Sequence, residues 1–189
     1  MRNMNNIVFL GAGSIGTALG NSLAARQDLK VSLLSVEQDV VETITSSHIN
    51  QKYFPNIRLN QSLKATTDQN ILKDAGVVFI AIPSVAVVEY MQLIRLLLHE
   101  DAILVNLAKG FGCHQQIISQ CLAEHLPNPV CALKGPSFAR EIINNSPTAF
   151  TLAANDIEIC KQLEPIFDDT NLFVDISSDL LGVEISSIL

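Results

Sequence analysis

Short runs of β-branched and other apolar residues alternate along the chain with stretches in which apolar positions recur at helical spacing. This alternation is typical of βαβ units, which build a parallel sheet with helices on its faces. We therefore expect an α/β fold with a doubly wound parallel sheet. The predicted strands cover residues 7–10, 31–35, 63–66, 76–82, 102–107, 130–133, 148–153 and 172–176.

Helical spacing fills the intervals between these strands, and Asp68 is expected to cap one short helix. The last helix, from about Ser178, shows no ending signal, because no capping Gly, basic residue or Pro closes residues 182–189. We interpret the chain as the amino-terminal part of a longer protein, in which residues 1–176 form a dinucleotide-binding domain and residues 177–189 begin a helix leading to an absent domain. The other predicted helices cover residues 15–26, 40–48, 85–98, 115–125 and 157–167, and one more opens at Ser137.

Composition narrows the class of protein. Of 189 residues, 48% are hydrophobic and 16% are charged, which is typical of a folded domain rather than a disordered chain. The formal charge of −7, without a basic cluster, argues against nucleic acid as a partner. The longest apolar run, residues 77–83, is far below the roughly 20 residues of a membrane-spanning helix, so we expect a cytoplasmic protein without membrane insertion. A homodimer stays open.

The clearest chemical motif is G-x-G-x-x-G at Gly11, Gly13 and Gly16, directly after the first predicted strand and at the start of a helix. In this position Gly11 permits a tight turn, Gly13 lets backbone N–H groups approach a pyrophosphate, and Gly16 lets the helix pack closely. The helix N-terminus also favours an anion. The motif predicts a Rossmann-like site for NAD.

The second strand ends close to Glu37, about 20 residues after the glycines, where a carboxylate would accept the ribose hydroxyls of NAD. A solvated charge at a helix start is nearly as good a reading of Glu37. No Arg is present here to hold the 2′-phosphate of NADP, so the sequence favours NAD, with NADP possible.

Ligands of open α/β sheets bind at the carboxyl ends of the strands, where further candidates lie. Pro83, Lys109, Gly135 and Ser137 all follow predicted strands. Lys109 could place an ammonium group beside a phosphate or a carbonyl oxygen, although a lone Lys reads equally well as a surface charge.

In their order and approximate spacing, six segments resemble the family of NAD(P)-dependent glycerol-3-phosphate dehydrogenases, and the resemblance covers essentially the whole chain. The G-P-S-F-A segment together with the Lys-Gly turn is its most specific part. The match continues at residues 182–184. The six segments are residues 11–19 (GAGSIGTAL), 52–55 (KYFP), 65–68 (ATTD), 81–84 (AIPS), 108–110 (AKG) and 135–141 (GPSFARE).

The resemblance implies reversible hydride transfer between nicotinamide and a small phosphorylated substrate, dihydroxyacetone phosphate or sn-glycerol 3-phosphate, in the service of phospholipid synthesis. It makes Lys109 a contact to both cofactor and substrate. By position, it assigns substrate contacts to Gly135 and Ser137 and cofactor contacts to Ser14, Ile15, Tyr53 and Ala139.

Several positions depart from the family pattern: Ile15 replaces an aromatic residue, Val36 an Arg, Gly112 a Glu, Lys134 a small hydroxyl residue, and Ser186-Ser187 two glycines. The family's proton-transferring Lys would follow Leu189. We therefore expect these 189 residues alone to bind dinucleotide weakly and to turn over little substrate.

Other functions stay open at this stage. One is a non-catalytic module that binds NAD(H) or senses its redox state, and another is a dehydrogenase for a different 2-hydroxy or 2-oxo substrate, which the G-P-S-F-A segment disfavours. Cys113, His114, Cys121 and His125 fit no common zinc spacing, so we expect no metal site and read the cysteines, with Cys131 and Cys160, as reduced thiols.

Overall fold

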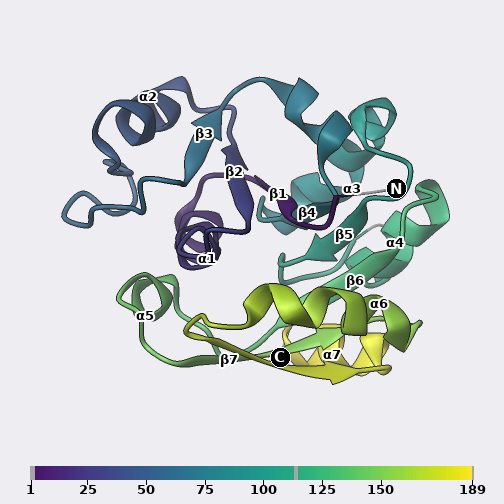
Figure 1. The fold of residues 1–189 in the computed structure, drawn as a ribbon. Coiled ribbons are helices and arrows are strands. Elements are labelled where there is room, and N and C mark those ends of the chain that lie inside the picture. Colours follow the sequence, from purple (N-terminus) through teal and green to yellow (C-terminus); the bar gives the residue numbers. More distant parts are fainter. Residues whose placement is uncertain (1–2, 113–114, 189) are drawn as a thin grey trace.

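The computed structural model describes residues 3–112 and 115–188, and it contains one eight-stranded sheet flanked by helices (Figure 1). The strand order is β3-β2-β1-β4-β5-β6-β7-β8. The strands are β1 (Asn6–Leu10), β2 (Lys30–Leu34), β3 (Lys64–Thr66), β4 (Val77–Ile80), β5 (Ile103–Asn106), β6 (Val130–Lys134), β7 (Thr148–Ala153) and β8 (Leu172–Ser177).

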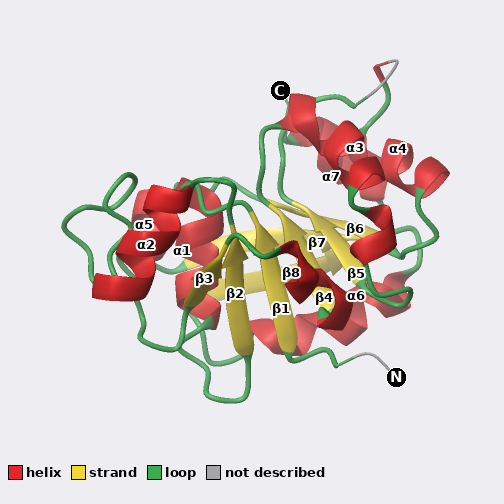
Figure 2. Ribbon diagram, turned by 90° about the horizontal axis from the view of Figure 1, so that it is seen from above, coloured by secondary structure: helices red, strands yellow, loops and turns green. Residues whose placement is uncertain are grey.

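Helices cover both faces of the sheet, as the doubly wound prediction requires. On one face α1, α5 and α6 pack with the side chains of Phe9 and Phe79, whose rings stack with centroids 4.6 Å apart. On the other face α3 and α4 pack against Val8 and Leu104. Figure 2 shows α1 and α5 on one side of the sheet and α3 and α4 on the other. The helices are α1 (Ser14–Leu23), α2 (Gln38–Ser47), α3 (Ser84–Leu93), α4 (Ile118–His125), α5 (Ala139–Ile143), α6 (Ile157–Leu163) and α7 (Leu180–Ser186).

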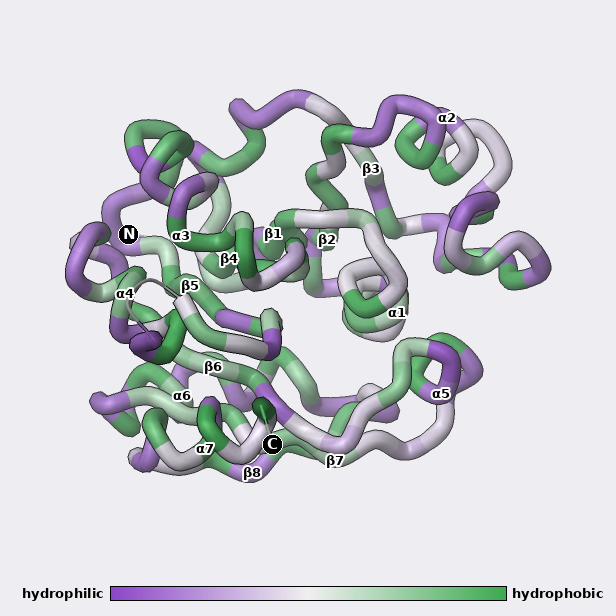
Figure 3. The backbone as a smooth tube through the Cα atoms, turned by 180° about the vertical axis from the view of Figure 1, so that it is seen from behind, coloured by the Kyte–Doolittle hydropathy of each residue, from purple (hydrophilic) through white to green (hydrophobic). Residues whose placement is uncertain are grey.

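The central strands are buried on both faces, which explains why their sequences are almost entirely apolar rather than alternating; the buried Asn106 at the end of β5 is polar. All four residues of β4 and all four of β5 are buried. Figure 3 shows this as a continuous hydrophobic centre through β1, β4, β5 and β6. No helix in the described ranges is long and apolar enough to cross a membrane.

One strand pairing departs from the predicted parallel sheet, because β7 runs antiparallel to β6. The reason is the connection between them. Its only α-helix, α5, has five residues and is about 7.5 Å long, too short to carry the chain back along a strand of about 17 Å. The chain therefore re-enters the sheet at the same end of the strands at which β6 leaves it, and β7 runs in the opposite direction. All other pairings are parallel.

Several helix boundaries differ from the sequence pattern by two to five residues. The helix α1 ends at Leu23 rather than at residue 26, and α6 ends at Leu163, followed by a 3-10 helix over Glu164–Phe167. The helix expected from residue 115 begins at Ile118, because Gln115 has a positive φ of 63°. The helix expected from Ser137 begins at Ala139. The helix expected over 85–98 ends at Leu93 and is followed by a short 3-10 turn, Arg95–Leu97. Asp68 caps a 3-10 helix, as predicted for a cap.

Candidate functional site

The glycine motif forms the turn between β1 and α1. Gly11 has a φ of +112°, which favours glycine, and a Cβ there would lie 2.6 Å from the carbonyl oxygen of Ala81. A Cβ on Gly16 would lie 2.2 Å from the carbonyl oxygen of Gly11, so α1 packs against the turn itself. A Cβ on Gly13 would meet nothing within 4 Å. The sequence predicts that a pyrophosphate approaches the backbone at Gly13, and the space beside Gly13 is open.

The N-terminus of α1 is suited to an anion as well. Gly13 occupies the N-cap position, and no side chain within the described ranges caps this helix. The first N–H groups of a helix lack intrahelical partners and carry partial positive charge. The turn therefore presents backbone donors to the space beside Gly13.

A buried amide holds the glycine turn in place from behind. Asn50 is fully buried, and its Nδ2 donates to the Ala12 carbonyl at 3.0 Å and to Thr17 Oγ1 at 2.8 Å. Its Oδ1 accepts from the backbone N–H of Tyr53 at 3.3 Å. One side chain thus connects the glycine turn to the loop that carries Tyr53.

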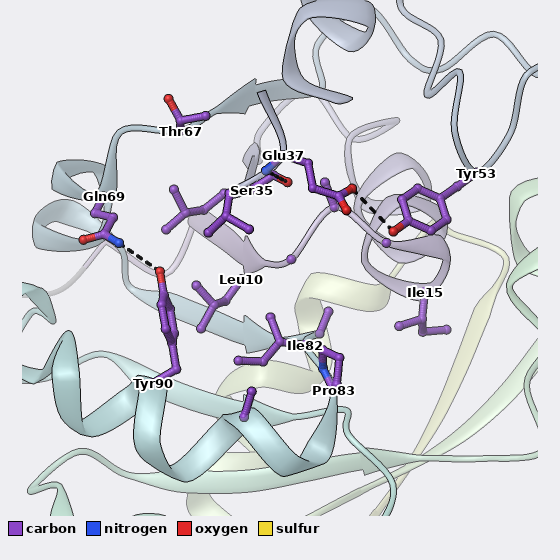
Figure 4. Close-up of a pocket in the computed structure, with 17 residues that line it drawn as sticks. Leu10, Ile15, Ser35, Glu37, Tyr53, Thr67, Gln69, Ile82, Pro83 and Tyr90 are labelled. Atoms are coloured by element: carbon purple, nitrogen blue, oxygen red, sulfur yellow. Dashed lines mark hydrogen bonds between the residues drawn. The ribbon is translucent and has the colours of Figure 1, made fainter. Parts of the chain in front are cut away.

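A cavity of about 810 Å³ opens at the carboxyl ends of β1, β2 and β4, beside this turn (Figure 4). Six of the predicted cofactor residues line it, namely Gly11, Gly13, Ile15, Glu37, Tyr53 and Pro83. Of the other predicted cofactor residues outside the Lys109 turn, exposed Ser14, buried Gly16 and half-buried Ala139 do not line it. Residues that the sequence did not single out complete the walls, among them Thr67, Gln69 and Tyr90, the last two joined by a 2.9 Å hydrogen bond.

Glu37 does not face the cavity as an isolated carboxylate. Its Oε1 lies 2.6 Å from Lys52 Nζ, and its Oε2 accepts a 3.4 Å hydrogen bond from the Tyr53 hydroxyl, which Figure 4 shows pointing toward it. The hydrogen bond from Lys52 to Glu37 raises the pKa of Lys52. Lys52 also lies 5.4 Å from the centre of the Tyr53 ring. Sequence reasoning missed Lys52 as a cation at the end of β2, because 15 residues separate it from Glu37.

A second cavity, of about 430 Å³, continues from the first, and Ile15, Ile82 and Pro83 line both. Lys109, Gly135 and Ser137 lie in its wall, so the structure brings together the three residues predicted to contact substrate. Gly110, directly after Lys109, has a φ of +129° that only glycine adopts readily.

A buried polar cluster lies beneath the Lys109 turn. Lys134 and Glu184 are 5% and 3% exposed, and their Nζ and Oε1 atoms are 3.6 Å apart. Burial lowers the pKa of Lys134 to about 8, because the loss of hydration outweighs the attraction of Glu184, and nearby Lys109 lowers it further. The sequence had marked Lys134 only as a departure from a family pattern.

The cysteines and histidines considered as a metal site lie only partly within the described residues. Cys113 and His114 lie outside the described residues, while Cys121, Cys131 and Cys160 are buried. Burial raises the pKa values of Cys131 and Cys160. Among the residues that the structure describes, no group of three His, Cys, Asp or Glu side chains is placed to hold a metal ion.

Comparison with known proteins gives a consistent result. Residues 6–160 match the family model described as the NAD-dependent glycerol-3-phosphate dehydrogenase N-terminus. The glycerol-3-phosphate dehydrogenase [NAD(P)+] of Clostridium acetobutylicum is 32% identical over 185 residues, which are 96% of this chain and 55% of the relative. The chloroplastic glycerol-3-phosphate dehydrogenase [NAD(+)] 2 of Arabidopsis thaliana is 34% identical over 189 residues, 97% of this chain and 45% of the relative.

A solved structure shows the same arrangement of elements. The crystal structure of glycerol-3-phosphate dehydrogenase from Coxiella burnetii superposes with a TM-score of 0.88 at 32% identity, covering 96% of this chain and 56% of that one. The chain thus spans about half the length of the relatives it matches.

Proposed function

Since the chain belongs to the family described as the NAD-dependent glycerol-3-phosphate dehydrogenase N-terminus, we propose that it is the dinucleotide-binding part of such an enzyme. The reaction we propose is hydride transfer between nicotinamide and dihydroxyacetone phosphate or sn-glycerol 3-phosphate. In this proposal residues 1–176 are the cofactor domain, and residues 177–189 lead toward the part that holds the rest of the substrate site.

One observation carries the proposal: two cavities meet at the strand ends and share Ile15, Ile82 and Pro83. The larger begins at the glycine turn, and the smaller bears Lys109. A dinucleotide that lies in the larger cavity with its reactive ring at the shared wall would place that ring beside Lys109. When bound, NAD(H) accepts or supplies the hydride.

The residues of the larger cavity fit a dinucleotide. The space beside Gly13 is open, and the backbone N–H groups of the first turn of α1 would hold the pyrophosphate there. Glu37 would accept the ribose hydroxyls, and Tyr53, whose hydroxyl donates to Glu37, would lie on the adenine side. Ser14 and Ala139, assigned by resemblance, are proposed as cofactor contacts on that ground alone.

Lys52 changes the expected choice of cofactor. A free Glu37 would repel the 2′-phosphate of NADP, whereas the Lys52 ammonium at 2.6 Å offsets this charge and can itself bind the phosphate. We therefore propose that the site takes NAD and also admits NADP.

The smaller cavity is the proposed site of a phosphorylated substrate. The Lys109 ammonium would pair with its negative charge or with the carbonyl oxygen that becomes an alkoxide during reduction. Gly135 and Ser137 would contribute the opposite wall. The resemblance places the residue that moves the proton after Leu189, so we propose that these 189 residues bind dinucleotide but turn over little substrate.

NADH emission tests the proposal, because the chain contains no Trp and its protein background is low. We expect enhanced emission on binding, with affinity weaker than that of a full-length relative, and slow or absent oxidation of NADH on adding dihydroxyacetone phosphate. No enhancement at millimolar NADH would contradict the cofactor site. Turnover at the rate of a full-length relative would contradict the proposed division of labour between this chain and the rest of the enzyme.

A further inference from the structure

Two side chains fix the turn that carries Lys109. Each of them forms a hydrogen bond with the backbone of Ala108, one with its N–H and the other with its carbonyl. The backbone N–H of Ala108 donates to Oδ1 of Asn106 at 3.0 Å. The Ala108 carbonyl accepts a hydrogen bond from Nζ of Lys134. Both polar groups of the residue before Lys109 are therefore fixed by side chains.

The side chains of Asn106 and Lys134 both contact the carboxylate of Glu184. Oε1 of Glu184 accepts from Asn106 Nδ2 and lies 3.6 Å from Lys134 Nζ. Oε2 of Glu184 accepts from the backbone N–H of Ser119 at 3.1 Å. Asn106 is fully buried, and Lys134 and Glu184 are nearly so, so this is a dry network with little competition from water.

Four elements meet in this network: β5 supplies Asn106, β6 Lys134, α4 Ser119 and α7 Glu184. Lys109 itself is exposed and stands on the cavity side of the turn. Burying a Lys and a Glu costs desolvation energy, and apolar residues often replace such pairs without loss of stability. Stability alone therefore does not explain this pair, and a role in positioning the turn does.

We propose that Lys134, with Asn106 and Glu184, is a positioning residue that holds the Lys109 ammonium toward an anionic ligand in the smaller cavity. This inference rests on the proposed function, in which Lys109 contacts a phosphorylated substrate. Lys134 also lines the smaller cavity, and the role proposed for it here is the hydrogen bond to the Ala108 carbonyl, through which it acts on Lys109.

The charge of Lys134 should also make anion binding in the smaller cavity depend on pH. The charged groups that act on it are Glu184 from α7 and Lys109 from the turn, and burial lowers its pKa to about 8. Above that pH its hydrogen bond to Ala108 becomes a neutral one, and neutral hydrogen bonds are weaker than charge-assisted ones. Anion binding should therefore weaken above pH 8 more than dinucleotide binding does.

The test measures two affinities in the same chain, for NADH alone and for sn-glycerol 3-phosphate added to the NADH complex, a pair of reduced ligands that cannot react. The variants are Lys134→Met, the charge-balanced double variant Lys134→Met with Glu184→Gln, Lys134→Arg and Lys109→Met. Lys161→Met, which removes an exposed Lys from the pair with Glu158, is the control. The double variant guards against misfolding by leaving no unpaired buried charge.

We expect the double variant to weaken sn-glycerol 3-phosphate roughly fivefold, with NADH affinity and the Lys161→Met control unchanged. Lys134→Arg should bind as wild type at pH 7 and lose the decline above pH 8, because Arg keeps its charge. If Lys109→Met weakens phosphate binding but the Lys134 variants and the pH profile match wild type, the positioning role is overturned and the proposed function stands. If Lys109→Met has no effect either, or if the wild-type NADH complex does not bind sn-glycerol 3-phosphate, both the positioning role and the proposed substrate site are contradicted.

Discussion

Lys52 Nζ lies 2.6 Å from Oε1 of Glu37, so the carboxylate that the sequence assigns to the ribose is already paired with a cation. Glu37 lines the larger cavity, and the side chain of its partner Lys52 is about half exposed, at 49%. In the proposed site, the balance between these two charges would set the choice between NAD and NADP.

Replacing Lys52 with Met should therefore shift the cofactor preference. We expect NADPH to bind about tenfold more weakly, because Glu37 then repels the 2′-phosphate without compensation, while NADH affinity stays within about twofold. Fluorescence titrations at two salt concentrations measure both values. The NADPH effect should shrink at high salt, and equal losses for the two cofactors would contradict the assignment.

Substitutions at Gly13 and Gly16 should affect different properties, NADH binding at Gly13 and stability at Gly16. A methyl group at Gly13 meets open space, so Gly13→Ala should unfold at nearly the wild-type denaturant concentration, yet hinder the approach of the pyrophosphate and weaken NADH about tenfold. Gly16→Ala must displace the Gly11 carbonyl and should destabilise the fold by about 2 kcal/mol or more. Urea unfolding and NADH titration of both variants test this. Normal NADH binding by folded Gly13→Ala would place the pyrophosphate elsewhere.

Asn50 should matter for both stability and binding. Asn50→Ala leaves the Ala12 carbonyl and Thr17 hydroxyl without their amide partner, at a cost of about 1–3 kcal/mol. It also releases Tyr53 from the glycine turn. We expect weaker NADH binding even where the variant is fully folded by circular dichroism, and unchanged NADH affinity there would refute this coupling.

Stability should show an unusual pH dependence from Lys134. Its folded-state pKa is lowered from 10.5 to about 8, so between these values the unfolded chain binds more protons than the native one. The contribution of Lys134 to stability therefore increases as pH rises from about 8 to 10.5, by about 3 kcal/mol in total. Urea unfolding from pH 7 to 10 of wild type, compared with Lys134→Met combined with Glu184→Gln, isolates this effect. Parallel curves would show that Lys134 titrates normally.

Much of the fold was predictable because local patterns coincide with burial. The apolar strand Val77–Ile80 and the largely apolar strand Ile103–Asn106 are buried on both faces, and the glycine turn lies where strand and helix meet. The antiparallel β7 was not predictable from its own residues, since its direction depends on the length of α5, a short helix whose start the sequence misplaced by two residues.

The site was predicted in part for a similar reason. Residues at strand ends, such as Glu37, Pro83 and Lys109, were found because parallel strands end at one edge of the sheet. Lys52, Asn50 and the Lys134–Glu184 pair act through contacts between residues 15 to 50 positions apart, which no local pattern records.

The most direct test of the dinucleotide site is a map of backbone amide NMR shifts during titration with NADH, followed by sn-glycerol 3-phosphate. We expect NADH first to perturb residues 11–16, 35–37, 53 and 81–82, and the phosphate ligand then to perturb Lys109, Gly135 and Ser137. Perturbations that fall away from these strand ends, or none at saturating NADH, would contradict it.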